Sequence, residues 1–74
     1  MNKKNFKVDD KIQFIKTGDS RLDGETGTIL GKSISDDIID FYIVLFDRTI
    51  SGYSYKAISM IESCIELVEK ENNV

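Results

Sequence analysis

The chain has no histidine and a single cysteine, Cys64, among its 74 residues. Histidine is the commonest general base in enzymes and the commonest protein ligand of transition metals, so its absence removes the usual starting point for both kinds of site. One cysteine cannot form an internal disulfide bond or supply a structural zinc site. We therefore expect no catalytic residues, no metal and no cofactor, and we expect Cys64 to be a small core residue.

Long apolar runs are also missing. No stretch approaches the ~18 to 20 residues of a membrane-spanning helix, and the N-terminal sequence MNKKNFKVDD lacks the apolar block of a signal peptide. With 41% hydrophobic and 31% charged residues, the composition is typical of a globular protein. We expect a single cytoplasmic domain over residues 1–74, with its core at about 8–69, frayed ends at 1–5 and 70–74, and no membrane contact.

The net charge of −3 is unevenly distributed along the chain. Lysines outnumber Asp9 and Asp10 in the first sixteen residues, whereas the remainder is strongly acidic. An acidic body repels a polyanion, so nonspecific binding of nucleic acid should be weak and sensitive to salt. Charge thus disfavours DNA or RNA as the partner; in that alternative the phosphates would be contacted by Lys3, Lys4, Lys7, Lys11 and Lys16.

Alternating apolar and polar residues predict strands in the first half of the chain. KIQFI, residues 11–15, places Ile12 and Phe14 on one face. Residues 16–25 are rich in Gly, Asp, Ser and Thr and contain only Leu22 as an apolar anchor, which predicts a long surface loop. Residues 27–34 alternate again and predict a second strand.

The second half begins with the most strand-prone run. IIDFYIVLF, residues 38–46, carries branched and aromatic residues on both faces and should be the central strand. Alternation sends Tyr42 and Phe46 to one face of it. The Ser51-Gly52 pair predicts a turn, after which residues 53–60 predict a fourth strand.

The C-terminal part is open to two interpretations. Apolar residues at helical spacing, together with a possible capping box, are compatible with four strands and a helix over 60–71. Ile65 and Leu67 alternate with Glu66, which instead suits a helical turn at 60–63 followed by a short fifth strand. We favour the second interpretation, a mainly β fold of five strands.

Four segments, VDDKIQFI, GETGTILG, DFYIVLFD and AISMIESCIELVE, together resemble the SH3-like small β-barrels, in particular the KOW-type pattern in which Gly-x-x-Gly-x-apolar opens the second strand. The resemblance covers residues 8–69 and implies a partly open barrel. Barrels of this type serve ribosomal proteins, transcription elongation factors, signalling adaptors and enzyme subunits, so the resemblance implies a scaffold and no single function. Asp9-Asp10 stands where KOW-type domains usually have Gly-Asp.

The glycines of these segments are interpreted as structural. Gly24 and Gly27 precede a strand, whereas phosphate-binding loops lead into a helix. We expect Gly24 to supply a positive φ angle, Gly27 or Gly31 to allow a bulge or a tight corner, and Gly52 to form a turn.

The remaining aromatic residues are the best indication of a binding surface. Tyrosine offers a large contact area with a polar tip, which suits interfaces. We expect a larger protein partner to be contacted by a group of aromatic and basic residues: Tyr53, Tyr55, Lys56, Arg48 and Tyr42.

Three functional hypotheses follow. The favoured one is a small non-enzymatic binding module, an accessory or phage-encoded regulator that docks on a larger protein. The second is a KOW-type module that binds nucleic acid or acts with the ribosome or transcription machinery. The third is an acidic inhibitor that imitates nucleic-acid phosphates. The sequence leaves the partner and the oligomeric state undefined.

Overall fold

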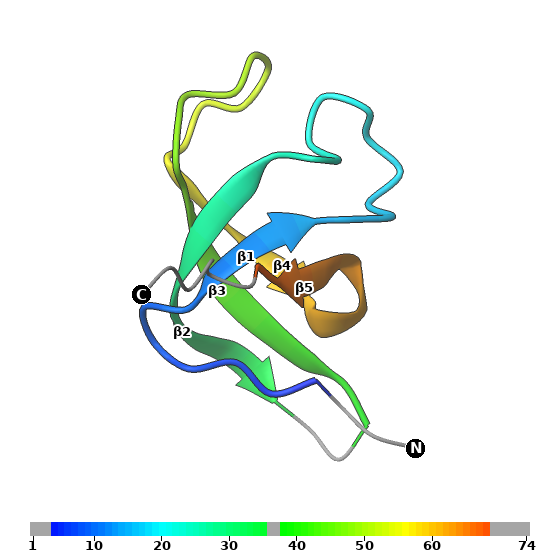
Figure 1. Ribbon diagram of the computed structural model, residues 1–74, viewed down its shortest axis with the longest axis vertical. Helices are drawn as coiled ribbons and strands as arrows, with labels where there is room; N and C mark the ends of the chain where they lie inside the picture. Colours follow the sequence, from blue (N-terminus) through cyan, green and yellow to red (C-terminus); the bar gives the residue numbers. More distant parts are fainter. Residues whose placement is uncertain (1–3, 36–37, 69–74) are drawn as a thin grey trace, which may run out of the picture.

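The computed structural model describes residues 4–35 and 38–68. They form one antiparallel sheet of five strands in the order β4-β3-β2-β1-β5 (Figure 1). Its elements are β1 (Lys11–Phe14), β2 (Thr26–Ser35), β3 (Asp40–Phe46), β4 (Ala57–Ile61), the 3-10 turn η1 (Glu62–Cys64) and β5 (Ile65–Leu67). Within these residues β4 and β5 do not pair, so the sheet is not closed. The predicted mainly β fold of five strands with a short helical turn is confirmed.

The C-terminal segment follows the favoured interpretation. β5 pairs with β1 in a register that places Ile65 opposite Phe14 and Leu67 opposite Ile12. In this extended conformation Ile65 is fully buried against β1, which favours the strand. The alternative helix over 60–71 is wrong in its described part, and residues 69–71 lie outside the described ranges.

Two strands begin later than the sequence predicts. The central strand begins at Asp40 instead of 38, and the fourth begins at Ala57 instead of 53. The Tyr53 N–H donates to the Ile50 carbonyl at 3.0 Å, forming a turn that buries Ile50. Residues 53–56 are therefore loop, although their sequence alternates.

The core is formed by the face of β3 that carries Tyr42, Val44 and Phe46. Aromatic rings meet at defined angles within it: Phe6 lies edge-on to Tyr42, and Phe14 is tilted against Phe46. The other members of this cluster are Ile12, Leu22, Ile29, Ile50 and Ile65. Cys64, predicted to be a core residue, is only half-buried, and its Sγ donates to the Lys16 carbonyl at 3.4 Å.

The N-terminal segment contacts the sheet from Lys4 onward. Lys4 donates its N–H to Glu62 Oε1 and its Nζ to the Ile65 carbonyl, each at 3.0 Å. The Phe6 N–H donates to Tyr42 Oη at 3.2 Å inside the core. Asn5 Oδ1 accepts from Tyr42 Oη at 3.5 Å. Lys4 and Asn5, within the segment expected to fray, are thus in contact with the fold; residues 1–3 and 70–74 lie outside the described ranges.

Positive φ angles occur at the turns that the sequence marks. Asp9 has φ 79° in the turn before β1. Gly24 has positive φ, as expected, and Gly52, expected to form a turn, has positive φ as well. Gly27 serves a different purpose: a Cβ there would lie 2.5 Å from Val44 Cγ1 and 2.7 Å from the Leu45 carbonyl oxygen. Because glycine has no Cβ, β2 can approach β3 closely at this position.

β2 is the longest strand, and it is irregular because its register against β3 shifts between Ile29 and Gly31 and again between Lys32 and Ile34. Such bulges bend a strand, which lets one sheet curl around its own core. Among residues 4–35 and 38–68, no helical segment has both the length and the apolar character of a membrane span.

Candidate functional site

The β1–β2 loop (residues 15–25) and the β3–β4 loop (residues 47–56) extend from the same end of the molecule (Figure 1). Hydrogen bonds join them at two places. Tyr53 Oη donates to Asp19 Oδ2 at 2.7 Å, and the Arg48 guanidinium binds the Glu25 carboxylate. Leu22, almost fully buried, fixes the first loop to the core as its sequence predicts. The two loops therefore form one surface.

Asp19 is the centre of the first contact. Its carboxylate accepts hydrogen bonds from Arg21 Nε, Arg21 Nη2 and Tyr53 Oη. The Arg21 and Tyr53 hydrogen bonds hold the pKa of Asp19 well below its ordinary value, and the hydrogen bond to Asp19 raises the pKa of Tyr53. The Arg21 guanidinium also lies 5.6 Å from the centroid of the Tyr53 ring, and that ring packs edge-on against Phe46. Tyr53 is thus an anchor between the loops.

Arg48 and Glu25 form a bidentate pair with distances of 2.8 and 2.7 Å. The hydrogen bonds from Arg48 lower the pKa of Glu25, and the same contact raises the pKa of Arg48. The Arg48 side chain remains 73% exposed in this arrangement. A planar guanidinium held in place and open to solvent can still present its free edge to a ligand.

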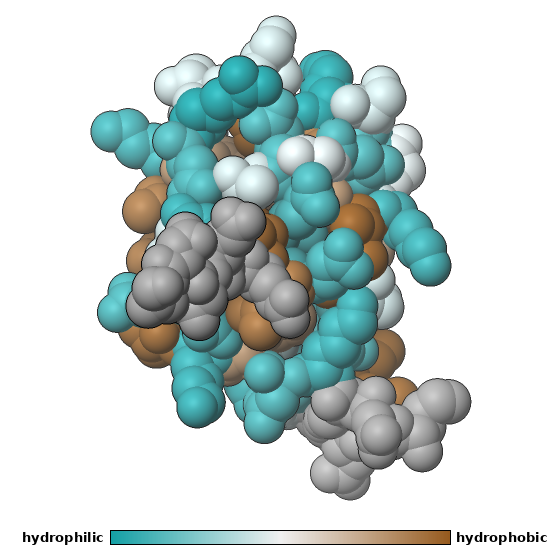
Figure 2. All heavy atoms as spheres, viewed as in Figure 1, coloured by the Kyte–Doolittle hydropathy of each residue, from teal (hydrophilic) through white to brown (hydrophobic). Residues whose placement is uncertain are grey.

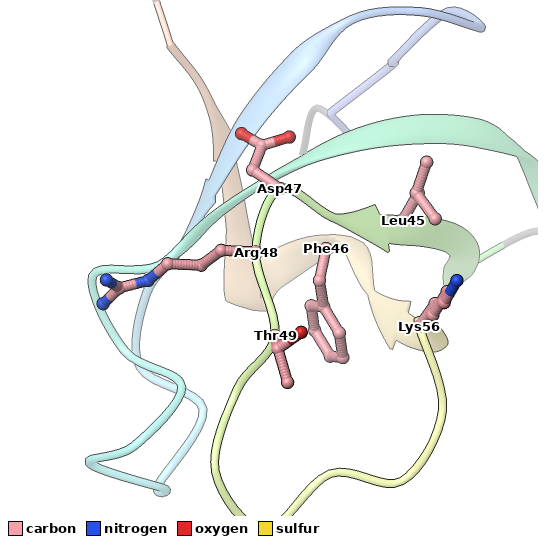
Figure 3. A pocket seen from close by; sticks show the side chains of 6 residues that line it. All are labelled: Leu45, Phe46, Asp47, Arg48, Thr49 and Lys56. Carbon is pink, nitrogen blue, oxygen red and sulfur yellow. The ribbon is translucent and has the colours of Figure 1, made fainter.

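A small hollow of about 190 Å³ lies beside this pair, at the junction of β3 and the β3–β4 loop. Phe46 points into it, while Arg48 extends toward the start of β2 and Lys56 lies on the other side (Figure 3). The complete lining is Leu45, Phe46, Asp47, Arg48, Thr49 and Lys56. Leu45 is 37% exposed, so the hollow combines an apolar part with two cations.

The structure brings together most of the residues expected to bind a protein. Arg48 and Lys56 line one hollow, Tyr55 lies next to Lys56 in the chain and is 79% exposed, and Tyr53 holds the loop beneath them. Tyr42 does not join this group. Its side chain is 1% exposed, packs against Phe6 and lies under Lys32, because β3 turns this face toward the core. The expectation that Tyr42 contacts a partner is corrected to a role in the core.

Sequence reasoning missed Leu45, Thr49 and Asp47 as neighbours of the two cations. Leu45 could have been found from the sequence, because strand alternation places its side chain on the other face of β3 from those of Val44 and Phe46. Asp47 is held by Lys11, whose Nζ donates to both carboxylate oxygens at 2.9 and 3.0 Å. Burial raises the pKa of Asp47 and its hydrogen bonds from Lys11 and two threonines lower it, with a net lowering.

The N-terminal lysines are not gathered on one surface. Lys11 forms an ion pair with Asp47, and the Lys4 ammonium donates to the Ile65 carbonyl. Lys7 and Lys16 are exposed, but they flank opposite ends of β1, and Lys3 lies outside the described residues. Figure 2 shows hydrophilic residues over much of the viewed face, interrupted by smaller apolar areas.

Among residues 4–35 and 38–68, most acidic side chains are bound within the chain. Asp10 accepts from the Lys7 N–H, Asp23 from Thr17, and Asp40, which is 2% exposed, from Ser35 Oγ at 2.7 Å. Asp36 and Asp37 lie outside the described ranges. A surface that imitates phosphates requires carboxylates free to meet a basic partner, and these carboxylates are already bound.

A second hollow of about 330 Å³ lies at β5 and is lined by Lys4, Asn5, Phe6, Glu66 and Leu67. Within the described ranges, no group of three or more His, Cys, Asp or Glu residues is placed to hold a metal ion.

Comparisons of the chain with protein families, with curated proteins and with solved structures find no match in any of the three.

Proposed function

We propose that the chain is a small non-enzymatic β module of the SH3-like, KOW-type class that acts in the cytoplasm and docks on a larger protein through its β3–β4 loop. The docking surface consists of Tyr55, Lys56, Arg48 and the hollow between the last two. The observation that carries the proposal is the large exposed tyrosine beside a cation and an apolar hollow, on a loop fixed to the fold by Tyr53.

The composition of this surface supports a protein partner. Tyrosine and arginine are enriched among the residues that contribute most to protein interfaces, and Tyr55 and Arg48 supply one of each. Exposing most of a tyrosine ring to water brings no benefit to the free protein, so covering it on binding releases free energy. Phe46 and Leu45 provide an apolar contact for a side chain that enters the hollow.

The loop is also held in place before binding. The Tyr53 hydroxyl is bound to Asp19, its ring to Phe46, and the Arg48 guanidinium to Glu25. A segment that is already ordered loses less conformational entropy when a partner binds. These contacts come from two separate loops, which keeps Tyr55 in a defined position relative to the hollow.

The chemistry of the hollow favours an acidic segment with an apolar side chain as the ligand. Within the described part of the chain, Lys56 has no ion-pair partner, whereas Asp47 is neutralised by Lys11. The net character of the lining is therefore positive. A carboxylate of the partner would meet Lys56 and the open edge of Arg48, and an apolar side chain would contact Phe46.

The experiment is an affinity capture from a cell lysate, with and without nuclease, read by mass spectrometry. Four variants accompany the wild type: Tyr55→Ala and Lys56→Ala within the surface, and Val8→Ala and Lys7→Ala as matched controls on exposed residues before β1. We expect protein partners that survive nuclease treatment, that are lost with both surface variants and that are retained by both controls.

The same experiment separates the alternatives. Capture that disappears with nuclease and weakens in Lys7→Ala would contradict the proposal and favour the KOW-type nucleic-acid hypothesis. Capture of a basic nucleic-acid enzyme, released by added DNA and unaffected at Tyr55, would favour the acidic inhibitor. Equal capture by all variants would remove the β3–β4 loop as the docking surface.

A further inference from the structure

The outer edge of β4 is open in the part of the chain that the structure describes, because β4 ends the sheet and pairs only with β3. The register places Ile58 opposite Val44 and Met60 opposite Tyr42. Phe46 donates its N–H to the Lys56 carbonyl at 2.8 Å, which fixes the phase of the antiparallel ladder. Since inward and outward backbone groups alternate, those of Ala57 and Ser59 and the Ile61 N–H point away from β3.

This edge lacks the usual protection against pairing. Natural proteins guard edge strands with charged residues, proline or bulges. β4 reads AISMI, contains no charge and no proline, and pairs with β3 without a register shift. Ser59, at its centre, is exposed. The strand is therefore suited to accept another strand.

The flanking charges indicate which strand that is. Lys56 precedes β4 and Glu62 follows it, each three residues from Ser59. In an antiparallel pair of two identical strands centred on Ser59, Lys56 of each chain, just before β4, lies near Glu62 of the other, the first residue of η1. Pairing two identical strands in parallel would instead place Lys56 beside Lys56 and Glu62 beside Glu62, which is repulsive. A strand of a different protein would not match this symmetric arrangement of charges.

We propose that a second copy of the chain pairs with β4 in the antiparallel register that places Ser59 opposite Ser59. The two Ser59 residues exchange both backbone hydrogen bonds, and the Ile61 N–H of each chain donates to the Ala57 carbonyl of the other. Among the described residues, these backbone groups have no partner on the outer edge. The result is a continuous sheet with a twofold axis at Ser59.

The charges are available for this contact. Lys56 is exposed and makes no ion pair with the described residues. Glu62 Oε1 accepts the Lys4 N–H at 3.0 Å, and in the described part of the chain Oε2 has no partner. Opposite charges that lie close together on paired strands stabilise the pair, and the symmetry supplies this contact twice.

The test is the molar mass measured by sedimentation equilibrium from micromolar to millimolar protein. We expect the mass to rise toward twice that of one chain. Ser59→Pro removes the outward N–H without removing a bond to β3, which an edge strand tolerates, and it should keep the mass of a single chain. Ser59→Ala keeps the N–H and should associate as the wild type does.

Charge variants test the register of the two strands. They remain informative even if the Ser59→Pro variant does not fold. Lys56→Glu replaces both attractive contacts by repulsive ones and should weaken association roughly tenfold. Adding Glu62→Lys to the same chain should restore it. A mass of one chain at every concentration in the wild type, or unchanged association in both Ser59→Pro and Lys56→Glu, would overturn the proposal.

The proposed function is tested separately, without Lys56 variants, because Lys56 belongs to both proposed surfaces. Tyr55→Ala should lose the captured protein and keep the wild-type association, because Tyr55 is in the loop and not in the edge strand. Ser59→Pro should lose association and keep the captured protein.

Discussion

The hydroxyl of Tyr53 donates a 2.7 Å hydrogen bond to the Asp19 carboxylate, and these two residues lie 34 positions apart in loops on either side of β2 and β3. The ring of the same tyrosine rests on Phe46 and faces the Arg21 guanidinium. One side chain therefore ties two loops and the core together. The position of the candidate docking surface depends on it, because Tyr55 and Lys56 follow directly in the chain.

Tyr53→Phe tests this relationship. Loss of the hydroxyl removes one hydrogen bond to a carboxylate and leaves the ring in place, so we expect the melting temperature to fall by roughly 2–5 °C. Tyr55→Phe is the matched control, since the Tyr55 hydroxyl has no hydrogen-bond partner among the described residues. Thermal unfolding followed by circular dichroism measures both. Equal melting temperatures for the two variants would contradict the anchoring role.

Acid should destabilise the fold through the carboxylates that join the loops. Hydrogen bonds lower the pKa of Asp19, mainly from Arg21, and of Glu25, from Arg48. The folded state therefore favours the ionised carboxylates, and their contribution is complete above the pKa values of the unfolded chain, at about pH 4. As the pH falls below this value toward the lower pKa values of the folded state, the contribution is lost.

Urea unfolding at a series of pH values from neutral to about 2 measures this dependence. The wild type should be equally stable at neutral and mildly acidic pH with respect to these groups and should then decline. Asp19→Asn should start from a lower stability and decline less steeply, because it has one carboxylate fewer to protonate. Parallel curves for the two proteins would show that Asp19 makes no such contribution.

Strand alternation made much of the fold predictable. The alternating residues of 40–46 defined the two faces of β3, and Ile65 with Leu67 indicated a strand instead of a helix. The fourth strand was placed four residues too early because Tyr53 and Tyr55 also alternate. Contacts with Asp19 and Phe46, from distant parts of the chain, hold Tyr53 in the loop. Local pattern carries no information about such contacts.

The candidate site was predictable only where its residues lie close together in the sequence. Arg48 and Lys56 lie close to the same turn in the sequence, so their convergence on one hollow follows from the hairpin. Alternation placed the side chain of Tyr42 on the other face of β3 from those of its sequence neighbours, but it did not show which face would be buried. Asp40 similarly contributes to the acidic composition yet is buried against Ser35 and Lys32. Pairing of this kind requires the register of β2 against β3.

Two glycines of β2 should respond differently to alanine. At Gly27 a Cβ would lie within 2.7 Å of the Leu45 carbonyl oxygen, so Gly27→Ala must push β2 away from β3. We expect the free energy of unfolding to fall by about 3 kcal/mol. At Gly31 no heavy atom lies within 4 Å of the added Cβ, and Gly31→Ala should change stability by less than about 1 kcal/mol, toward greater stability. Denaturant unfolding compares the two, and an equal loss in both would contradict the close approach at Gly27.

Asp9 has φ 79° in the turn before β1, a conformation that costs an L-residue free energy and that glycine adopts freely. Its N–H donates to the Ile29 carbonyl, and glycine keeps this bond. Asp9→Gly should therefore raise the free energy of unfolding by about 0.5 kcal/mol, the relief of strain exceeding the greater entropy of the unfolded chain. Asp9→Ala retains the strain without the tolerance of aspartate and should lower it by about 1 kcal/mol. Denaturant unfolding distinguishes these outcomes, and a less stable Asp9→Gly would mean that the Asp9 side chain, rather than the backbone, stabilises the turn.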